Sequence, residues 1–386
     1  MRKLILLAML GAALSGCATV KNAFRGKDAV EPPKLLEEVS ASVTFQKIWS
    51  ASVGDGPTKV GGKLSPAYAN GRVFIADAKG NVLALDVDSG RKLWEVDTEA
   101  RLSGGPGAGS GAVVVGTLDG DVIALNPENG ANLWRARATS EVITAPAVGL
   151  TRVVVRSNDG TVSAFDSTSG ERQWIFNKTL PLLTLRGNSS PVLISDRVVI
   201  GFDNGRVVAL NDVDGAQVWE QSLADADGRT ELERITDIDG IVVADEGELF
   251  ASAYNGRTAQ LDLTSGRTIW VRDVSSYSGI GVSPTQVFVS DGESSLQGLD
   301  RRSGASLWKQ EAFLRRSLTA AAEVDGIAVV GDYEGYLHAL KADTGAIVGR
   351  YKQGGDGFAV APFAVGKTIF ALDRSGTLTA YRLSGG

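Results

Sequence analysis

Short runs of apolar residues alternate with polar turns along most of the chain, and the whole pattern repeats. The seven tryptophans mark the repeat, with successive spacings of 45, 40, 40, 45, 51 and 38 residues. They are Trp49, Trp94, Trp134, Trp174, Trp219, Trp270 and Trp308. A repeat of this length, made of short strands, is typical of β-propeller blades, which stack in a ring because one blade cannot bury its own faces.

Each repeat contains four predicted strands, and the first complete copy shows them all. Pro66 opens an initial strand, where the missing N–H of a proline is tolerated. Residues 72–75 and 81–85 are apolar runs joined by a Lys-Gly turn. The polar segment 86–90 ends in a glycine and is the turn into a fourth strand, 91–96, which carries Trp94. Asp-Gly or Asn-Gly takes the place of Lys-Gly in several other copies.

The third strand of this unit recurs eight times, which predicts eight blades. Its copies contain Val82, Val122, Val162, Val207, Thr258, Leu296, Leu337 and Leu378. The seventh repeat has Gly349 where a tryptophan is expected, and the eighth stops at residue 383 without a fourth strand. Trp49 has no repeat of its own, so we predict that its strand completes the eighth blade and removes an open sheet edge.

The predicted fold class is therefore all-β: an eight-bladed β-propeller of four-stranded antiparallel blades, closed by the N-terminal strand. We expect residues 45–386 to form this single domain. The expected role of the tryptophans is to fill the space between blades, because a repeat imposes the same packing need on every copy.

The N-terminus has the order of a secretory signal over residues 1–16, with a basic start and an apolar run that is short for a membrane span. Small residues before Cys17 resemble a lipoprotein processing site, which implies cleavage there and lipid on that cysteine. The alternative is an ordinary signal peptide with a chance cysteine. We expect residues 17–44 to be the lipidated N-terminus and a tether. Ala18, in place of an aspartate, resembles the pattern of outer-membrane lipoproteins, so the expected location is the periplasmic face of that membrane.

Charge and residue content exclude several function classes. Removing residues 1–16 deletes two of 39 basic side chains and none of 45 acidic ones, which leaves 37 against 45 and a net charge of −8. An acidic domain without a basic cluster argues against nucleic acid as a partner. His338 is the only histidine and Cys17 the only cysteine, so we expect neither a metal site built from these residues nor a catalytic triad. We expect His338 to be a packing residue.

Two neighbouring connections between blades are longer than the rest. The step from tryptophan to the start of the next strand spans 12 residues after Trp94 and Trp134, but 17 after Trp174 and 23 after Trp219. Since function in propellers usually lies in loops, these insertions are candidate interaction segments. Successive connections of this kind leave the ring on the same face, so we expect the two to lie side by side.

The first long connection carries Leu183, Leu185 and Arg186, a mixture of apolar side chains and arginine that suits an interface anchor. The alternative is a loop folded over the edge of its blade. The second connection carries Asp237 and Asp239, for which a solvated loop and a partner contact stay equally open.

Segments 183–187, 234–239 and 331–338 resemble those of the BamB family, the lipoprotein propellers of the bacterial machinery that assembles outer-membrane β-barrels. The resemblance covers signal, tether and eight blades. It implies a scaffold without catalytic activity or cofactor, which binds the POTRA domains of BamA and aids the folding and insertion of barrel proteins. It also implies partner contacts at Leu183, Leu185, Arg186, Asp237 and Asp239. Whether unfolded barrel substrates touch the ring directly stays open, and Gly240 departs from the Thr-Thr-Pro run that relatives often have.

The alternative function is that of a quinone-dependent periplasmic oxidoreductase. Residues 84–94 resemble the tryptophan-docking motif of quinoprotein alcohol dehydrogenases, which are also eight-bladed. Those enzymes bind a quinone with calcium, and many hold a disulfide of adjacent cysteines over it, whereas this chain has one cysteine and lacks their long inserts. We therefore interpret the motif as shared blade packing rather than shared chemistry.

Overall fold

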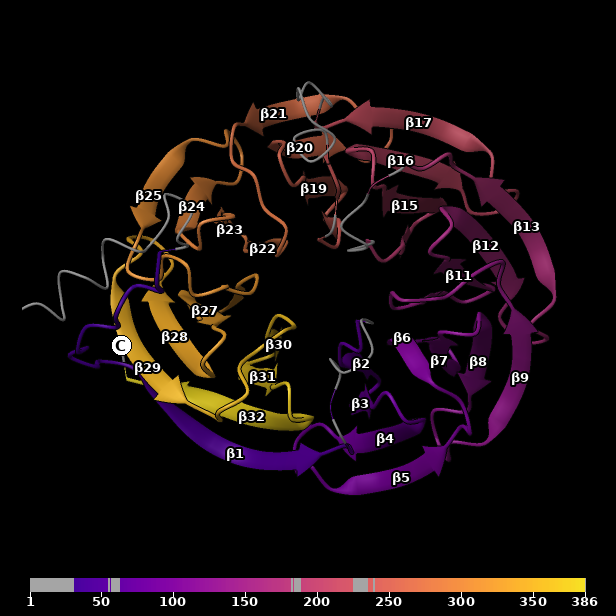
Figure 1. Cartoon of the computed structure of the whole chain (residues 1–386), viewed down its shortest axis with the longest axis horizontal. Helices are drawn as coiled ribbons and strands as arrows, with labels where there is room; N and C mark the ends of the chain where they lie inside the picture. Colours follow the sequence, from indigo (N-terminus) through magenta and orange to yellow (C-terminus); the bar gives the residue numbers. More distant parts are fainter. Residues whose placement is uncertain are drawn as a thin grey trace, which may run out of the picture.

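The computed structural model describes residues 31–54, 56, 63–181, 183, 189–224, 235–238 and 240–385. This part of the chain forms 32 strands in eight four-stranded antiparallel sheets, with no α-helix among the described residues. The sheets stand as blades around a central axis (Figure 1). The predicted eight-bladed propeller is confirmed.

The strands of each blade follow one another from the inside of the ring to the outside. Blades 1 to 4 consist of β2 (Ala67–Ala69), β3 (Arg72–Ala76), β4 (Asn81–Asp86) and β5 (Lys92–Asp97); β6 (Leu102–Gly109), β7 (Ala112–Thr117), β8 (Asp121–Leu125) and β9 (Asn132–Arg137); β10 (Ala147–Val148), β11 (Arg152–Arg156), β12 (Thr161–Asp166) and β13 (Arg172–Asn177); and β14 (Val192–Ile194), β15 (Arg197–Gly201), β16 (Arg206–Asn211) and β17 (Gln217–Ser222). Blades 5 to 8 consist of β18 (Val243–Asp245), β19 (Glu248–Ser252), β20 (Thr258–Asp262) and β21 (Thr268–Arg272); β22 (Ile280–Val282), β23 (Gln286–Ser290), β24 (Leu296–Asp300) and β25 (Ser306–Gln310); β26 (Ala322–Val324), β27 (Ile327–Gly331), β28 (Tyr336–Lys341) and β29 (Ile347–Lys352); and β30 (Phe363–Val365), β31 (Thr368–Leu372), β32 (Thr377–Ser384) and β1 (Thr44–Ser52).

The N-terminal strand closes the ring, as predicted. β1 pairs antiparallel with β32, with Thr44 opposite Ser384 and Ser52 opposite Thr377. Figure 1 shows this indigo strand along the outer edge of the yellow C-terminal blade. The last blade therefore combines the two ends of the described chain, and the C-terminal strand has no exposed edge.

The tryptophans join neighbouring blades, which confirms the packing role expected for them. The Nε1 of Trp94 in blade 1 donates a hydrogen bond to the carbonyl of Pro127 in blade 2, at 2.9 Å. Its ring lies against Gly130, where a Cβ would come within 2.8 Å of the ring carbons. The other six indole N–H groups bond in the same way to the following blade, with acceptors Val87, Ser167, Asp212, Leu263, Arg301 and Ala342.

The boundary between blades 7 and 8 lacks a tryptophan, and blade 8 has no turn between its third and fourth strands on which an indole could dock. In the other blades the indole docks on the turn between the third and fourth strands, but in blade 8 these strands, β32 and β1, come from opposite ends of the chain. Gly349 instead admits the carbonyl of Val43, which lies 2.4 Å from where a Cβ would stand. Phe45 then packs between Tyr351 and Tyr381, with ring centroids at 6.0 and 5.8 Å.

One strand start departs from the pattern of the first repeat, in which a proline opens the initial strand. Pro66, Pro146, Pro191 and Pro362 directly precede their strands, but Pro106 lies inside β6. The pairing of β6 with β7 shifts register on both sides of Gly104, so β6 begins earlier, at Leu102. The irregular register lets the strand extend without a ladder hydrogen bond from the proline.

The ring has two faces, which differ in the chain segments that they carry. We call one the loop face: it holds the connections between blades and the turns between second and third strands, such as 157–160. We call the other the turn face: it holds the turns between first and second strands and between third and fourth strands, such as 166–170. This assignment follows from the antiparallel order of the four strands in every sheet.

Candidate partner-binding face

Both long connections lie on the loop face, next to each other. The first joins β13 to β14, and the second joins β17 to β18, so they flank blade 4 on its two sides. Both insertions therefore lie in one sector of the loop face, and the four strands of each neighbouring blade are complete.

The first connection is held at both ends and directs a leucine outward between them. Leu180 packs on the hydrophobic cluster between blades 3 and 4. Gly160 has no side chain and so leaves room for that of Leu180. Ser189 and Ser190 are buried on the return to β14. Between these ends Leu183 is 47% exposed. A large apolar side chain presented on an inserted loop suits an interface contact, since the blades do not need it for packing.

The second connection returns to the ring as a buried arm. Residues 235–238 lie between the second-to-third-strand turns of blades 4 and 5, and all four are buried. Thr236 forms a parallel bridge with Asn204. The amide of Ile238 donates to the carbonyl of Phe202 at 3.3 Å, and Gly201 leaves room for its side chain.

Asp237 lies at the centre of this arm and is fully buried, with no exposed surface. Its carbonyl accepts a 2.7 Å hydrogen bond from the amide of Tyr254 in blade 5. In this conformation the side chain faces the ring rather than solvent. The structure thus buries Asp237 between the turns of blades 4 and 5 and leaves Leu183 about half exposed to solvent.

The remaining sequence-predicted site residues fall outside the described residues. Leu185, Arg186 and Asp239 belong to the two long connections, and Cys17 to the N-terminal region.

An ion pair that sequence reasoning missed joins blades 3 and 4 at the loop face. Arg156 at the end of β11 contacts Asp203 of blade 4 at 2.5 Å and donates to the carbonyl of Gly201 at 3.0 Å. Both charged side chains are buried, and the guanidinium lies over the ring of Phe202. The signal was present in the repeat, because the equivalent position is small or apolar in every other blade, for example Ala76 in blade 1.

A second buried polar cluster surrounds His338 in blade 7. The Nε of Arg350 donates to the His338 Nδ1 at 3.1 Å, so the imidazole hydrogen is on Nε2, which donates to Asp332 at 3.0 Å. Arg316 bonds the same carboxylate at 2.8 Å and also pairs with Glu334. His338 thus fills the interior, as expected for a packing residue.

The environment of this cluster shifts the pKa values of its members. Burial lowers the pKa of His338 below its usual 6.5, and the nearby Asp332 only partly offsets this. Burial alone would raise the pKa of Asp332, but the hydrogen bonds that its carboxylate accepts from His338, the Tyr336 amide and Arg316 together bring this pKa below 3.8. The pair is therefore held as a neutral imidazole beside a carboxylate.

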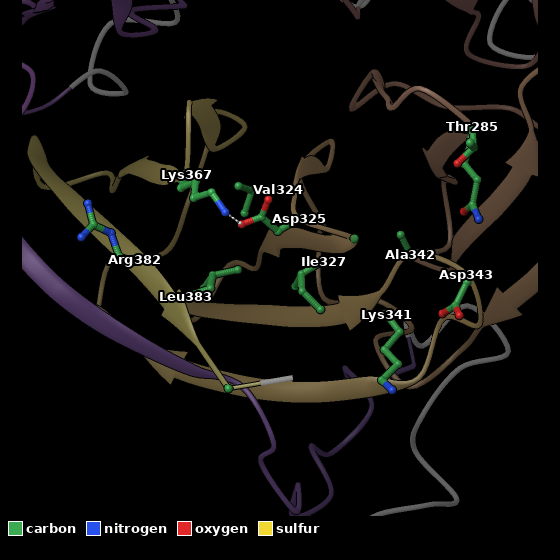
Figure 2. Close-up of a pocket in the computed structure, with 13 residues that line it drawn as sticks. Thr285, Val324, Asp325, Ile327, Lys341, Ala342, Asp343, Lys367, Arg382 and Leu383 are labelled. Carbon is green, nitrogen blue, oxygen red and sulfur yellow. Dashed lines mark ion pairs between the residues drawn. The ribbon is translucent and has the colours of Figure 1, made fainter.

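A groove on the turn face lies between blades 6, 7 and 8 (Figure 2). Its volume is about 660 Å³. Lys367 and Asp325 form a 3.0 Å ion pair across it, joined by a dashed line in Figure 2. Lys341 and Asp343 line another side. Charges of both signs, exposed to solvent, do not select one ligand type, and no histidine or cysteine is among its described lining residues.

A second cavity, of about 490 Å³, lies at the axis of the ring on the loop face. Its described lining is mainly apolar, with Ile241, Tyr277, Leu318 and Val360 among its residues. None of the described lining residues is acidic, although calcium in proteins needs carboxylate or carbonyl oxygens arranged around it. Elsewhere too, the described residues contain no group of three His, Cys, Asp or Glu placed to hold a metal ion. These residues do not fit a quinone–calcium site.

Comparison with known proteins identifies the family. A family model described as "Outer membrane protein assembly factor BamB" matches residues 78–310 and 292–386. The chain belongs to the BamB family. The BamB protein of Xanthomonas campestris is 43% identical, over 99% of this chain and 98% of its own length. That of Alkalilimnicola ehrlichii is 51% identical over 90% and 91%, and that of Escherichia coli K12 is 36% identical over 98% of both.

Solved structures agree on the fold. The crystal structure of BamB from Moraxella catarrhalis matches with a TM-score of 0.79 at 26% identity, covering 88% of this chain and all of the other. A quinohemoprotein alcohol dehydrogenase from Pseudomonas putida matches with a TM-score of 0.69 at 14% identity, over 91% of this chain and 78% of the other. The second likeness shows a shared propeller only, so the enzyme alternative gains no support from it.

Proposed function

We propose that the chain is a non-catalytic scaffold lipoprotein of the outer-membrane β-barrel assembly machinery, and that its loop face binds the POTRA domains of BamA. Membership of the BamB family over nearly the whole length supports the assembly role, since the relatives are named outer membrane protein assembly factors. The binding aids folding and insertion of barrel proteins by keeping the machinery together.

The observation that carries the choice of surface is the exposed Leu183 on an inserted connection. In this proposal Leu183, Leu185 and Arg186 are the anchors, and Asp239 is a weaker contact on the neighbouring loop. Because Asp237 is buried, its proposed role is to hold the second connection in place.

Binding of the purified periplasmic region of BamA tests the surface. Leu183→Ala should weaken the affinity, and Leu183 and Leu185 to Ala together should weaken it by about 30-fold, the equivalent of ~2 kcal/mol. Leu150→Ala is the matched control, since Leu150 is 77% exposed but lies in a turn-face loop of blade 3. Wild-type affinity in the Leu183 variants would exclude this surface, and a large fall in their melting temperature would show that the leucines pack within the ring.

The anchoring part of the proposal rests on Cys17. No helix in the described part of the chain has the length and apolarity of a membrane crossing. Cys17→Ser should leave the ring folded but release the protein from outer-membrane fractions, because acyl chains supply location rather than folding. Full retention of the variant in those fractions would show that another contact anchors the chain.

A further inference from the structure

Residues 31–43, part of the stretch expected to be a tether, lie against the outside of blade 7, and we call them the strap. Figure 1 shows them in indigo beside β28 and β29. The guanidinium of Arg315 donates to the carbonyl of Pro32 at 2.9 Å, and Arg350 donates to that of Glu37 at 2.6 Å. Side chains of the ring thus bind the backbone of the strap and not only its side chains.

Further contacts hold the strap along its length. The amide of Lys34 donates to the carbonyl of Leu314 at 3.0 Å, and Arg316 donates to the carbonyl of Lys34 at 3.2 Å. At the other end the amides of Ser42 and Val43 both donate to the carbonyl of Val348 at 2.9 Å. Between them Leu36 packs on the core cluster that contains Phe313, Leu318 and Leu340.

The strap crosses the full thickness of the ring. Arg315 and Arg316 belong to the connection between blades 6 and 7, on the loop face. Val348 is next to the turn between β28 and β29, on the turn face. The chain therefore enters on the loop face at Glu31, reaches the turn face at Val43, and returns along β1.

We propose that the strap re-routes the membrane anchor, so that the tether leaves the ring on the loop face that carries the two long connections. Without the strap, a tether joined directly to Thr44 would leave from the turn face, because β1 begins there. The inference rests on the anchoring part of the proposed function. Only 13 residues lie between Cys17 and Glu31, so 14 residue steps join the two. They span at most ~50 Å, so the point of exit limits which face approaches the membrane.

The chain offers a matched pair of variants for testing whether the strap is docked. Leu36→Asp places a carboxylate against an apolar cluster, whereas Leu35 beside it is 87% exposed, so Leu35→Asp is the control. Hydrogen exchange at the Lys34, Ser42 and Val43 amides should be slow in the wild type and in Leu35→Asp. It should rise by about tenfold or more in Leu36→Asp, with exchange in β28 unchanged. Arg315→Ala, which removes only contacts at the start of the strap, should accelerate exchange at Lys34 alone.

Fast exchange at these amides in the wild type would overturn the docking, as would equal exchange in the Leu36→Asp and Leu35→Asp proteins. If exchange in β28 also rises in Leu36→Asp, that substitution has disturbed blade 7 itself, and Arg315→Ala is compared with the wild type instead. Unchanged exchange at the Lys34 amide in Arg315→Ala would then overturn the docking.

Orientation is tested with the chain from Cys17 coupled to maleimide-lipid vesicles of phosphatidylcholine, which is specific because Cys17 is the only cysteine. A donor dye on a non-natural amino acid is placed at Glu293 on the loop face or at Arg302 on the turn face, both exposed positions of blade 6. Energy transfer to acceptor lipids should be stronger from position 293 in the wild type. The difference should shrink or reverse in Leu36→Asp.

Equal transfer from both positions in the wild type would overturn the re-routing. The vesicles contain no BamA, and the coupling replaces natural lipidation. Failure here therefore leaves the binding and anchoring proposals standing, and failure of those proposals leaves this result unchanged.

Discussion

Trp49 of the N-terminal strand lies directly over Gly90 of the first blade. A Cβ on Gly90 would stand 2.4 Å from the indole ring, and the Trp49 Nε1 donates to the carbonyl of Val87 at 3.1 Å. This contact joins the last blade to the first. A contact between a tryptophan and a glycine thus closes the ring, and the same type of contact occurs at six other blade boundaries.

Gly90→Ala should therefore destabilise the ring by about 2–4 kcal/mol, from overpacking against Trp49 together with a left-handed backbone that alanine resists. Gly71→Ala is the control for the backbone alone, since Gly71 has a similar φ of +75° against +67° for Gly90, and no atom lies within 4 Å of its Cβ position. Urea denaturation measures both. Equal losses in the two variants would show that the indole contact contributes nothing beyond backbone strain.

Truncation separates closure from anchoring. Deleting residues 18–40 removes most of the strap and should lower the melting temperature only slightly, because the blades stay complete. Deleting residues 18–50 also removes Trp49 and most of β1, which exposes the edge of β32 and leaves a space between blades 8 and 1. We expect a much larger loss of thermal stability and a tendency to aggregate. Similar melting temperatures for the two truncations would contradict closure by β1.

The buried pair of Arg156 and Asp203 should respond strongly to the loss of one partner. Arg156→Met should cost about 3–5 kcal/mol of unfolding free energy, because it leaves Asp203 buried without its cation. Adding Asp203→Asn should recover part of this. As a surface comparison, Arg101→Met breaks an exposed pair with Asp119 and should cost less than about 1 kcal/mol. Chemical denaturation would measure all three, and a loss as small as that of Arg101→Met would show that water reaches the buried pair.

Stability should fall as the medium becomes acidic, in two steps. Because the pKa of His338 is lower in the folded ring than its usual 6.5, the unfolded chain binds more protons below that pH, and folding free energy is lost as the pH falls through about 6.5. The pKa of Asp332 is also lower in the folded ring than its usual 3.8, so the unfolded chain again binds more protons and further folding free energy is lost below about pH 3.8. His338 is the only histidine, so His338→Gln should remove the first step. A first step that persists in His338→Gln would assign it to another group.

The repeat made the architecture readable from the amino-acid order. In six of the seven cases a glycine stands four residues before the tryptophan, and these two residues supply the two halves of the contact between neighbouring blades. The six copies of that spacing predicted the blades, and Trp49, which lacks the glycine, predicted the strand that closes the ring. Such inference works because every blade must solve the same packing problem with the same residues.

Contacts that occur only once leave no repeated spacing in the sequence, so only the tertiary structure showed which residues make them. The sequence offered Asp237 as a surface contact, but two turns of neighbouring blades enclose it. Residues 31–43 belong to the stretch that we expected to be a tether, yet arginines of β29 and of the connection between blades 6 and 7 bind their backbone carbonyls. Arg156 finds Asp203 only when blades 3 and 4 meet. In a repeat, the spacing of residues within one copy also describes the contact with the next copy, so the sequence reveals it. A single contact between distant segments leaves no such spacing, and it forms only when the ring has assembled.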